Sequence, residues 1–201
     1  MSKILMVRHG ETKGNSAERL WGDTDIELGA EGIRQAEQLR DRLAPEKIDF
    51  IYTSDMKRAI KTARIIASHH QLDITICPEL HELNFGKCEG LTFKEIWQRY
   101  PELMEKWPNR DLTFRYPGGE SMTELNSRAI KFLSRLNKHS SEETVLVVAH
   151  NGVLHFVICH LLQIDAICWR QVRTDLASLS IIETNPNGSI LTLLNDVSHL
   201  K

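Results

Sequence analysis

Short apolar runs alternate along the chain with stretches in which apolar residues recur every three or four positions. The runs are rich in β-branched residues and predict buried strands, at 3–8, 48–53, 74–77 and 144–149. The periodic stretches predict amphipathic helices, at 30–43, after Asp55, from Thr92 to about Tyr100, from Ser121, and at 153–162. Strands that alternate with helices in this way predict an α/β fold, with three layers, α/β/α, around a mostly parallel central sheet.

Several helix boundaries have local sequence patterns. Thr92 and Ser121 each stand three residues before a glutamate, which is the pattern of a capping box. Pro101 should interrupt the helix that begins at Thr92. Asp55 is expected to cap the helix that follows the strand at 48–53.

The end of the chain departs from the parallel pattern. Two final strands are predicted at 178–183 and 190–194, and Asn185-Pro186-Asn187-Gly188 between them is typical of a hairpin turn. A hairpin makes its two strands antiparallel, so the sheet should be mixed. With 201 residues we expect a single domain over 1–201, with a loop-rich excursion at about 88–120.

The composition is that of an ordinary globular protein, with 41% hydrophobic and 26% charged residues. A net charge of −2 gives no reason to expect a nucleic acid or a membrane surface as partner. We expect no secretory segment, and no stretch reaches the roughly 18–20 apolar residues that span a bilayer. The four cysteines have no C-x-x-C spacing and are expected to be reduced thiols. The expected protein is cytoplasmic, and a homodimer through the hairpin edge at 178–194 is left open.

Two predicted strands end alike. The strand at 3–8 leads into Arg8-His9-Gly10, and the strand at 144–149 leads into His150-Asn151-Gly152. Open α/β sheets bind ligands at the carboxyl ends of their strands, so the two histidines should face each other there. Histidine can attack phosphorus, and the planar fork of arginine matches phosphate oxygens. The pattern favours phosphoryl chemistry, with Arg8 and Arg58 as the cationic groups.

Structural roles are the alternative explanation of the same residues. A single histidine at a strand end is more often a hydrogen-bonded structural residue, and Arg58 alone would be a solvated helix residue. His69-His70, and His155 with His160, have neither the spacing nor the companion ligands of a metal site, so no metal is expected.

An ordered set of motifs resembles the histidine phosphatase superfamily, the phosphoglycerate-mutase-like group, from residue 3 to about 199. The motifs are Arg8-His9-Gly10-Glu11-Thr12 with Asn15, Ser54 with Arg58-Ala59 and Thr62-Ala63, Glu82 in Glu79-Leu80-His81-Glu82, and Val148-Ala149-His150-Asn151-Gly152. The resemblance implies a phosphoglycerate-mutase-like fold. It also implies a phosphatase that acts through a phosphohistidine and needs no metal or other cofactor.

The resemblance implies a role for each of these residues. His9 would attack phosphorus as a neutral imidazole, which the neighbouring arginines favour because they oppose a further positive charge. Glu82 would protonate the leaving oxygen and then activate water, for which it must first hold a proton. The residues implied to hold the phosphate are Arg8, Arg58, His150, Asn15 and, as a lining residue, Gly22.

The middle and the end of the chain are similar to the phosphatase branch. Only about 30 residues separate Gly90 from Glu120, whereas phosphoglycerate mutases are typically longer here. The segments 116–121 and 195–200 resemble α-ribazole phosphatases and their broad-specificity relatives. The resemblance implies hydrolysis of a small phosphorylated metabolite, with α-ribazole 5′-phosphate as the best single substrate and specificity set by 88–120.

Two departures and three alternatives accompany this assignment. Cys88 stands where the phosphatase branch usually has tryptophan, and Leu28-Gly29 lacks the hydroxyl residue that commonly caps the next helix. A broad-specificity phosphatase is the nearest alternative, and a cofactor-dependent phosphoglycerate mutase is the next. A catalytically silent binding module would be expected to have lost one of the two histidines or Arg58, and all three are present.

Overall fold

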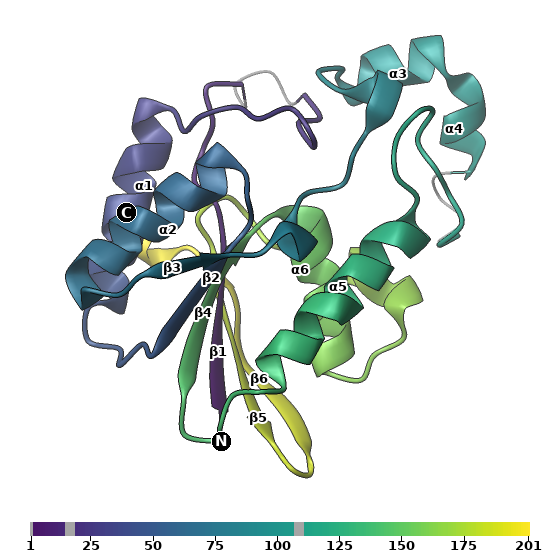
Figure 1. The fold of residues 1–201 in the computed structure, drawn as a ribbon. Coiled ribbons are helices and arrows are strands. Elements are labelled where there is room, and N and C mark those ends of the chain that lie inside the picture. Colours follow the sequence, from purple (N-terminus) through teal and green to yellow (C-terminus); the bar gives the residue numbers. More distant parts are fainter. Residues whose placement is uncertain (1, 15–18, 107–110) are drawn as a thin grey trace.

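The computed structural model describes residues 2–14, 19–106 and 111–201. Within this range the sheet has six strands in the order β3-β2-β4-β1-β5-β6 (Figure 1). The strands are β1 (Ser2–Arg8), β2 (Phe50–Thr53), β3 (Ile74–Ile76), β4 (Thr144–Ala149), β5 (Leu179–Asn185) and β6 (Gly188–Asp196). β4 pairs in parallel with β1 and β2, and β2 with β3, while β5 is antiparallel to both β1 and β6. The expected sheet, mostly parallel with an antiparallel terminal hairpin, is confirmed.

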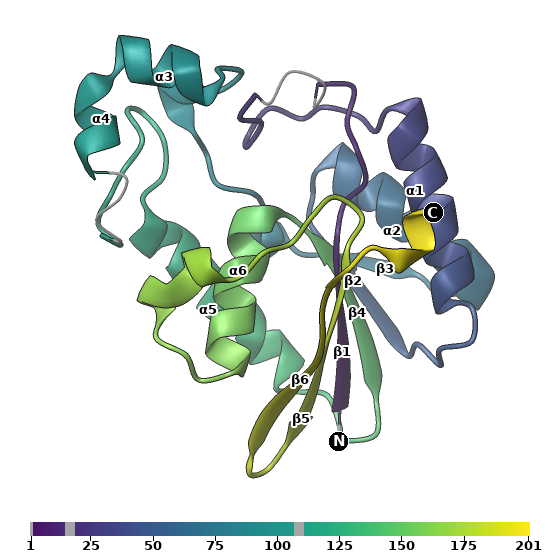
Figure 2. The same cartoon turned by 180° about the vertical axis from the view of Figure 1, so that it is seen from behind.

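Alternating side chains of the central strands enter two separate cores. Ile4 and Met6 of β1 pack into one core, and Leu5 and Val7 pack into the other. Helices α1 and α2 cover one face of the sheet, and α5 and α6 cover the other (Figures 1 and 2). These helices are α1 (Ala30–Leu43), α2 (Lys57–His70), α5 (Met122–Leu136) and α6 (Asn151–Leu161). A strand covered on both faces needs a continuous apolar run, which explains the sequence of β1.

The excursion extends beyond the carboxyl ends of the strands, at the top of Figure 1. Its helices are α3 (Phe93–Arg99) and α4 (Pro101–Lys106). It is joined to the loop before α1, because Leu20 N–H donates to the Leu91 carbonyl and Gly90 N–H donates to the Leu20 carbonyl. Arg19 strengthens this junction through bonds to the Gly90 carbonyl and the Glu95 carboxylate. The two segments are therefore held together at the edge where ligands of such sheets bind.

Short 3-10 turns complete the connections, at Pro78–Leu80, Gly86–Cys88, Ala166–Gln171 and Ser198–Leu200. All four cysteines are free, as expected. Within the described ranges no helix combines the length and the apolar character that crossing a bilayer requires.

Both capping boxes are confirmed, and one cap prediction is wrong. Thr92 and Ser121 each accept a hydrogen bond from the N–H of the third helical residue, and the glutamate there bonds back. Pro101 ends the first helix and begins α4. Asp55 does not cap α2: the helix starts at Lys57 after Met56, and the Asp55 carboxylate instead contacts the His81 ring at 2.7 Å. A hydrogen-bonding partner from a distant segment takes the place of the local cap.

Candidate active site

The carboxyl ends of β1 and β4 bring two histidines together. The ring centroids of His9 and His150 lie 4.9 Å apart. His9 lines a hollow of about 140 Å³, and the other described residues around it are Arg8, Thr12, Arg19, Leu20, Trp21, Arg58, Glu82, Phe85 and Asn151. A hollow of this size suits one phosphoryl group and is smaller than the ~300–1,000 Å³ that whole small ligands occupy.

The contacts of His9 fix which ring nitrogen is available. Its Nδ1 lies 2.7 Å from the Gly10 carbonyl oxygen. A carbonyl only accepts, so Nδ1 has the hydrogen and Nε2 keeps its lone pair in the neutral ring. Burial, followed by the charges of Arg58 and Arg8, lowers the pKa of His9 well below its ordinary value. The ring therefore stays neutral, as a nucleophilic imidazole must.

Two guanidinium groups adjoin this ring, and the carboxyl group of Glu82 lines the same hollow. Arg58 is 1% exposed and donates to the backbone carbonyls of Thr24 and Gly22 at 2.9 and 2.8 Å. Arg8 donates to the Thr174 carbonyl at 2.8 Å, and its buried Nε has no hydrogen-bond partner in the described ranges. Neither forms an ion pair with a described carboxylate. Burial lowers the pKa of both groups, but arginine remains charged in proteins. The two guanidinium groups give this part of the hollow a charge that suits an anion.

His150 lies behind the hollow, fully buried. Arg58 Nε donates to its Nδ1 at 3.3 Å, so the hydrogen of the neutral ring is on Nε2, which lies 2.7 Å from Ser54 Oγ. Burial, with Arg58 as the next cause, lowers the pKa of His150 well below its ordinary value. In this arrangement His150 orients Arg58, and a direct bond to phosphate would have to replace one of these two contacts.

Glu82 reaches the same hollow from the segment after β3. Its carboxylate accepts hydrogen bonds from the N–H of Leu83 at 2.9 Å and of Gly152 at 3.1 Å. A Cβ on Gly152 would lie 2.6 Å from Oε1, so this approach requires glycine at the start of α6. The structure thus places a carboxyl group and a neutral imidazole in one hollow, as proton transfer to a leaving oxygen requires.

Arg128 of α5 holds the backbone that bears Glu82. It donates to the carbonyls of Glu79, His81 and Glu82 at 3.1, 2.8 and 3.2 Å. The carboxylate of Glu120 accepts two further bonds from the same guanidinium, both at 2.7 Å. No sequence motif distinguishes Arg128 from an ordinary helix arginine, so sequence analysis missed it.

Gly22, another predicted site residue, does not line the hollow. Gly22 contributes its carbonyl to Arg58, and a Cβ there would lie 1.8 Å from the Leu83 carbonyl oxygen. Glycine is thus needed for close packing, beside rather than within the hollow. Asn15 lies outside the described residues.

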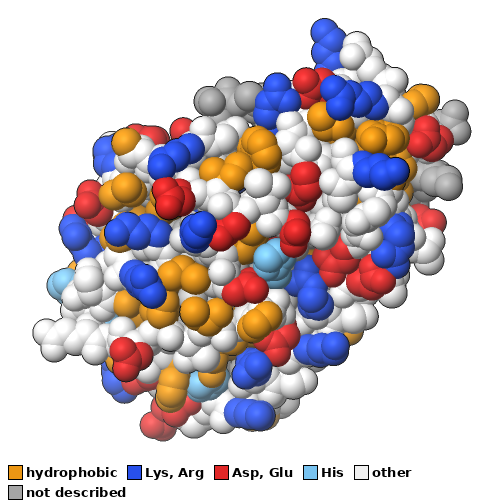
Figure 3. Space-filling model, turned by 45° about the horizontal axis from the view of Figure 1, so that its top comes forward, with side chains coloured by type: hydrophobic (Ala, Val, Ile, Leu, Met, Phe, Trp, Pro, Cys, Tyr) orange, Lys and Arg blue, Asp and Glu red, His pale blue; other side chains and the backbone are white. Residues whose placement is uncertain are grey.

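Two wider hollows adjoin the first. One, of about 470 Å³, shares Glu82, and its other ionisable lining residues are Asp23, Asp55, His81, Glu120, Glu124 and Arg128. The second, of about 880 Å³, shares Arg8 and Arg19 and extends toward Asp175 and Lys201. Figure 3 brings this end of the molecule forward and shows acidic side chains gathered near its middle. An ester's alcohol portion beside Glu82 would meet a surface richer in carboxylates than in cations.

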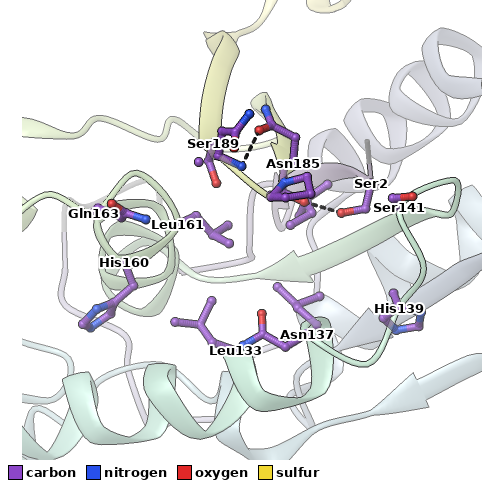
Figure 4. Close-up of a pocket in the computed structure, with 16 residues that line it drawn as sticks. Ser2, Leu133, Asn137, His139, Ser141, His160, Leu161, Gln163, Asn185 and Ser189 are labelled. Carbon is purple, nitrogen blue, oxygen red and sulfur yellow. Dashed lines mark hydrogen bonds between the residues drawn. The ribbon is translucent and has the colours of Figure 1, made fainter.

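The cavity in Figure 4 is unrelated to this chemistry. It has a volume of about 650 Å³ and lies between the C-terminal ends of α5 and α6 and the β5–β6 hairpin. Its described lining contains no lysine or arginine. Helix C-termini are negative ends of the helix dipole, so this cavity disfavours a phosphate. Nor do three His, Cys, Asp or Glu side chains gather as a metal site in the part of the chain that the structure describes.

Comparisons with known proteins agree with the fold. The family description "Histidine phosphatase superfamily (branch 1)" matches residues 4–197. Phosphoserine phosphatase 1 of Hydrogenobacter thermophilus is 31% identical over 200 residues, which cover 100% of this chain and 95% of the relative. Adenosylcobalamin/alpha-ribazole phosphatase of Escherichia coli K12 is 32% identical over 194 residues, 96% of this chain and 95% of the relative.

A solved structure is similar over nearly the whole fold. The crystal structure of the alpha-ribazole phosphatase from Shigella flexneri matches with a TM-score of 0.88 and 31% identity, and the match covers 96% of each chain. The fold and these relatives agree. The chain belongs to branch 1 of the histidine phosphatase superfamily and is a phosphatase hydrolase.

Proposed function

We propose that the protein hydrolyses small phosphomonoesters through a phosphohistidine at His9, without a metal ion. The observation that supports this most is the His9 ring, whose Nδ1 lies against the Gly10 carbonyl and leaves Nε2 available, beside two guanidinium groups that form no ion pair within the described ranges. Phosphoryl transfer depends on positioning and on stabilising negative charge, and Arg8 and Arg58 supply the charge that a metal ion supplies elsewhere.

The first step transfers the phosphoryl group to the protein. The lone pair of His9 Nε2 forms a bond to phosphorus while the bond from phosphorus to the ester oxygen breaks. Glu82 acts as the general acid that gives a proton to that oxygen, and the alcohol leaves neutral. The two arginines stabilise the negative charge spread over the remaining phosphate oxygens.

In the second step Glu82 acts as a base and His9 is the leaving group. The Glu82 carboxylate takes a proton from water, and the water oxygen forms a bond to phosphorus as the phosphorus–nitrogen bond breaks. Inorganic phosphate leaves, and His9 regains its lone pair. His150 contributes by orienting Arg58, and Arg128 by holding the Glu82 segment.

For the substrate we propose α-ribazole 5′-phosphate as the first candidate and a wider range of small esters as the second. One relative at 32% identity is named for α-ribazole phosphate, and another at 31% identity is named for phosphoserine. The carboxylates around the hollow beside Glu82 favour a neutral or amine-bearing alcohol and oppose a second anionic group. That charge distribution opposes 3-phosphoglycerate and therefore the mutase alternative.

A substrate panel in EDTA tests this function. We expect phosphate release from α-ribazole 5′-phosphate, phosphoserine and p-nitrophenyl phosphate. We also expect 2-aminoethyl phosphate to exceed the equally small 2-phosphoglycolate by about tenfold in kcat/KM, because only the latter adds a second anion. Isomerisation of primed 3-phosphoglycerate without phosphate release would contradict the proposal, and a reversed order of the two small esters would contradict the charge preference.

Glu82→Gln tests the proton donor. A glutamine of the same shape has no proton to give, so esters of alkyl alcohols should lose about 100-fold or more in kcat. The kcat for p-nitrophenyl phosphate, whose leaving group needs little protonation, should fall far less. The control is Glu37→Gln, an exposed change of the same kind on α1. Equal losses for both esters would refute the assignment of Glu82.

The neutral state of the two site histidines can be measured directly. In protein with nitrogen-15 histidine, His9 and His150 should show no protonation near pH 6.5, because burial and the two arginines lower their pKa. The unfolded chain binds these protons near pH 6.5, so the free energy of unfolding should fall as the pH drops below that value. The loss is about 1.4 kcal/mol per pH unit for each such histidine. Ordinary titration of both rings would contradict this electrostatic picture.

A further inference from the structure

Asn151, the first residue of α6, lines the hollow and makes side-chain contacts that no motif predicted. We propose, on the basis of the function proposed above, that its side-chain NH₂ group donates a hydrogen bond to a non-ester phosphate oxygen. We further propose that Thr174 and His155 are positioning residues that fix the direction of this amide.

Thr174 determines which end of the amide is available. Its hydroxyl donates to Asn151 Oδ1 at 2.9 Å, and Thr174 is 3% exposed. An amide has one accepting and one donating end, so engaging the oxygen leaves the NH₂ group for another partner. No hydrogen bond from Nδ2 is found within the described ranges. Asn151 is therefore a side-chain donor at a hollow that already has a positive character.

His155 fixes the direction of the hydroxyl in turn. Its Nε2 lies 3.2 Å from Thr174 Oγ1, while its buried Nδ1 has no partner in the described ranges. Thr174 gives its single hydrogen to Asn151, so His155 Nε2 must donate. Burial lowers the pKa of His155 to about 3, which keeps one hydrogen on the ring. Placing it on Nε2 avoids an unsatisfied buried N–H at Nδ1. The hydrogen bonds run one way, from His155 through Thr174 to Asn151.

The same threonine also holds Arg8, but through a different atom. Arg8 Nη1 donates to the Thr174 carbonyl oxygen at 2.8 Å. Thr174→Val keeps the shape and this carbonyl and removes only the hydroxyl. The variant therefore separates the proposed action through Asn151 from any action through Arg8.

A double-mutant cycle with Asn151→Ala and Thr174→Val tests the proposal. We measure kcat/KM and the dissociation constants of inorganic phosphate and orthovanadate. Asn151→Ala should lower kcat/KM about 10- to 100-fold, as expected for loss of one donor to developing negative charge. Thr174→Val should lower kcat/KM by a smaller factor. The double variant should have a kcat/KM no lower than that of Asn151→Ala alone. Thr174→Ser should restore the wild-type values.

Controls separate this role from a structural one. Thr192→Val, the same chemical change on β6, should leave all three quantities unchanged. Asn151→Asp keeps the Thr174 contact but places a carboxylate at the hollow, so it should weaken phosphate binding more than Asn151→Ala does. If a Thr174→Val chain does not fold, the Asn151→Asp and Asn151→Ala pair still decides whether the amide is a donor to phosphate.

Several results would overturn the proposal. Additive losses in the double variant would show that Thr174 does not act through Asn151, and unchanged phosphate and vanadate affinity in Asn151→Ala would show that the amide is no ligand. The proposed function fails separately, if the wild-type protein turns over no phosphomonoester. In that case anion affinity in the same variants still confirms or refutes the role of Asn151.

Discussion

The positive charge of Arg8 and Arg58 is the constraint on which the rest of this site depends. A buried cation is costly, and a protein retains one only where opposite charges, dipoles or a bound anion offset it. Here backbone carbonyls of Gly22, Thr24 and Thr174 supply part of the offset, and the charge of Glu82 acts on both arginines. A phosphoryl group would add to it. Burial, together with the same charges, lowers the pKa of His9. In the proposed mechanism the groups that would bind the phosphate thus help to keep the attacking group unprotonated.

The fold brings these groups together from separate elements. β1 and β4 are neighbours in the middle of a sheet covered on both faces, and each ends in a histidine. Glu82 is positioned by contacts at two places, because Arg128 holds its backbone while an α6 N–H binds its carboxylate. The site therefore depends on packing between the sheet, α5 and α6, and a change in α5 that releases Arg128 would reach the chemistry through the backbone of Glu82.

Sequence patterns predicted the parts of this structure that local physics determines. Apolar runs located β1 and β4, and the capping boxes at Thr92 and Ser121 located two helix starts, because each pattern is satisfied within a few residues. Asp55 was wrongly expected to cap α2, since its true partner, His81, is 26 residues away. Arg128 and Thr174 could not be found from sequence for the same reason: their roles come from contacts with distant segments, and neither lies in a distinctive motif. The acidic character of the 470 Å³ hollow beside Glu82 likewise arises only when folding brings Asp23, Asp55 and Glu120 together.

The central claim is that neutral His9 is the nucleophile, and trapping the intermediate tests it most directly. Protein mixed with phosphorus-32-labelled p-nitrophenyl phosphate in EDTA is quenched within milliseconds, and the labelled peptide is mapped by mass spectrometry. The account predicts label on the peptide containing His9, in a linkage that acid cleaves and base preserves, and none in His9→Ala. Label that survives acid, label on another residue, or turnover retained in His9→Ala would contradict it.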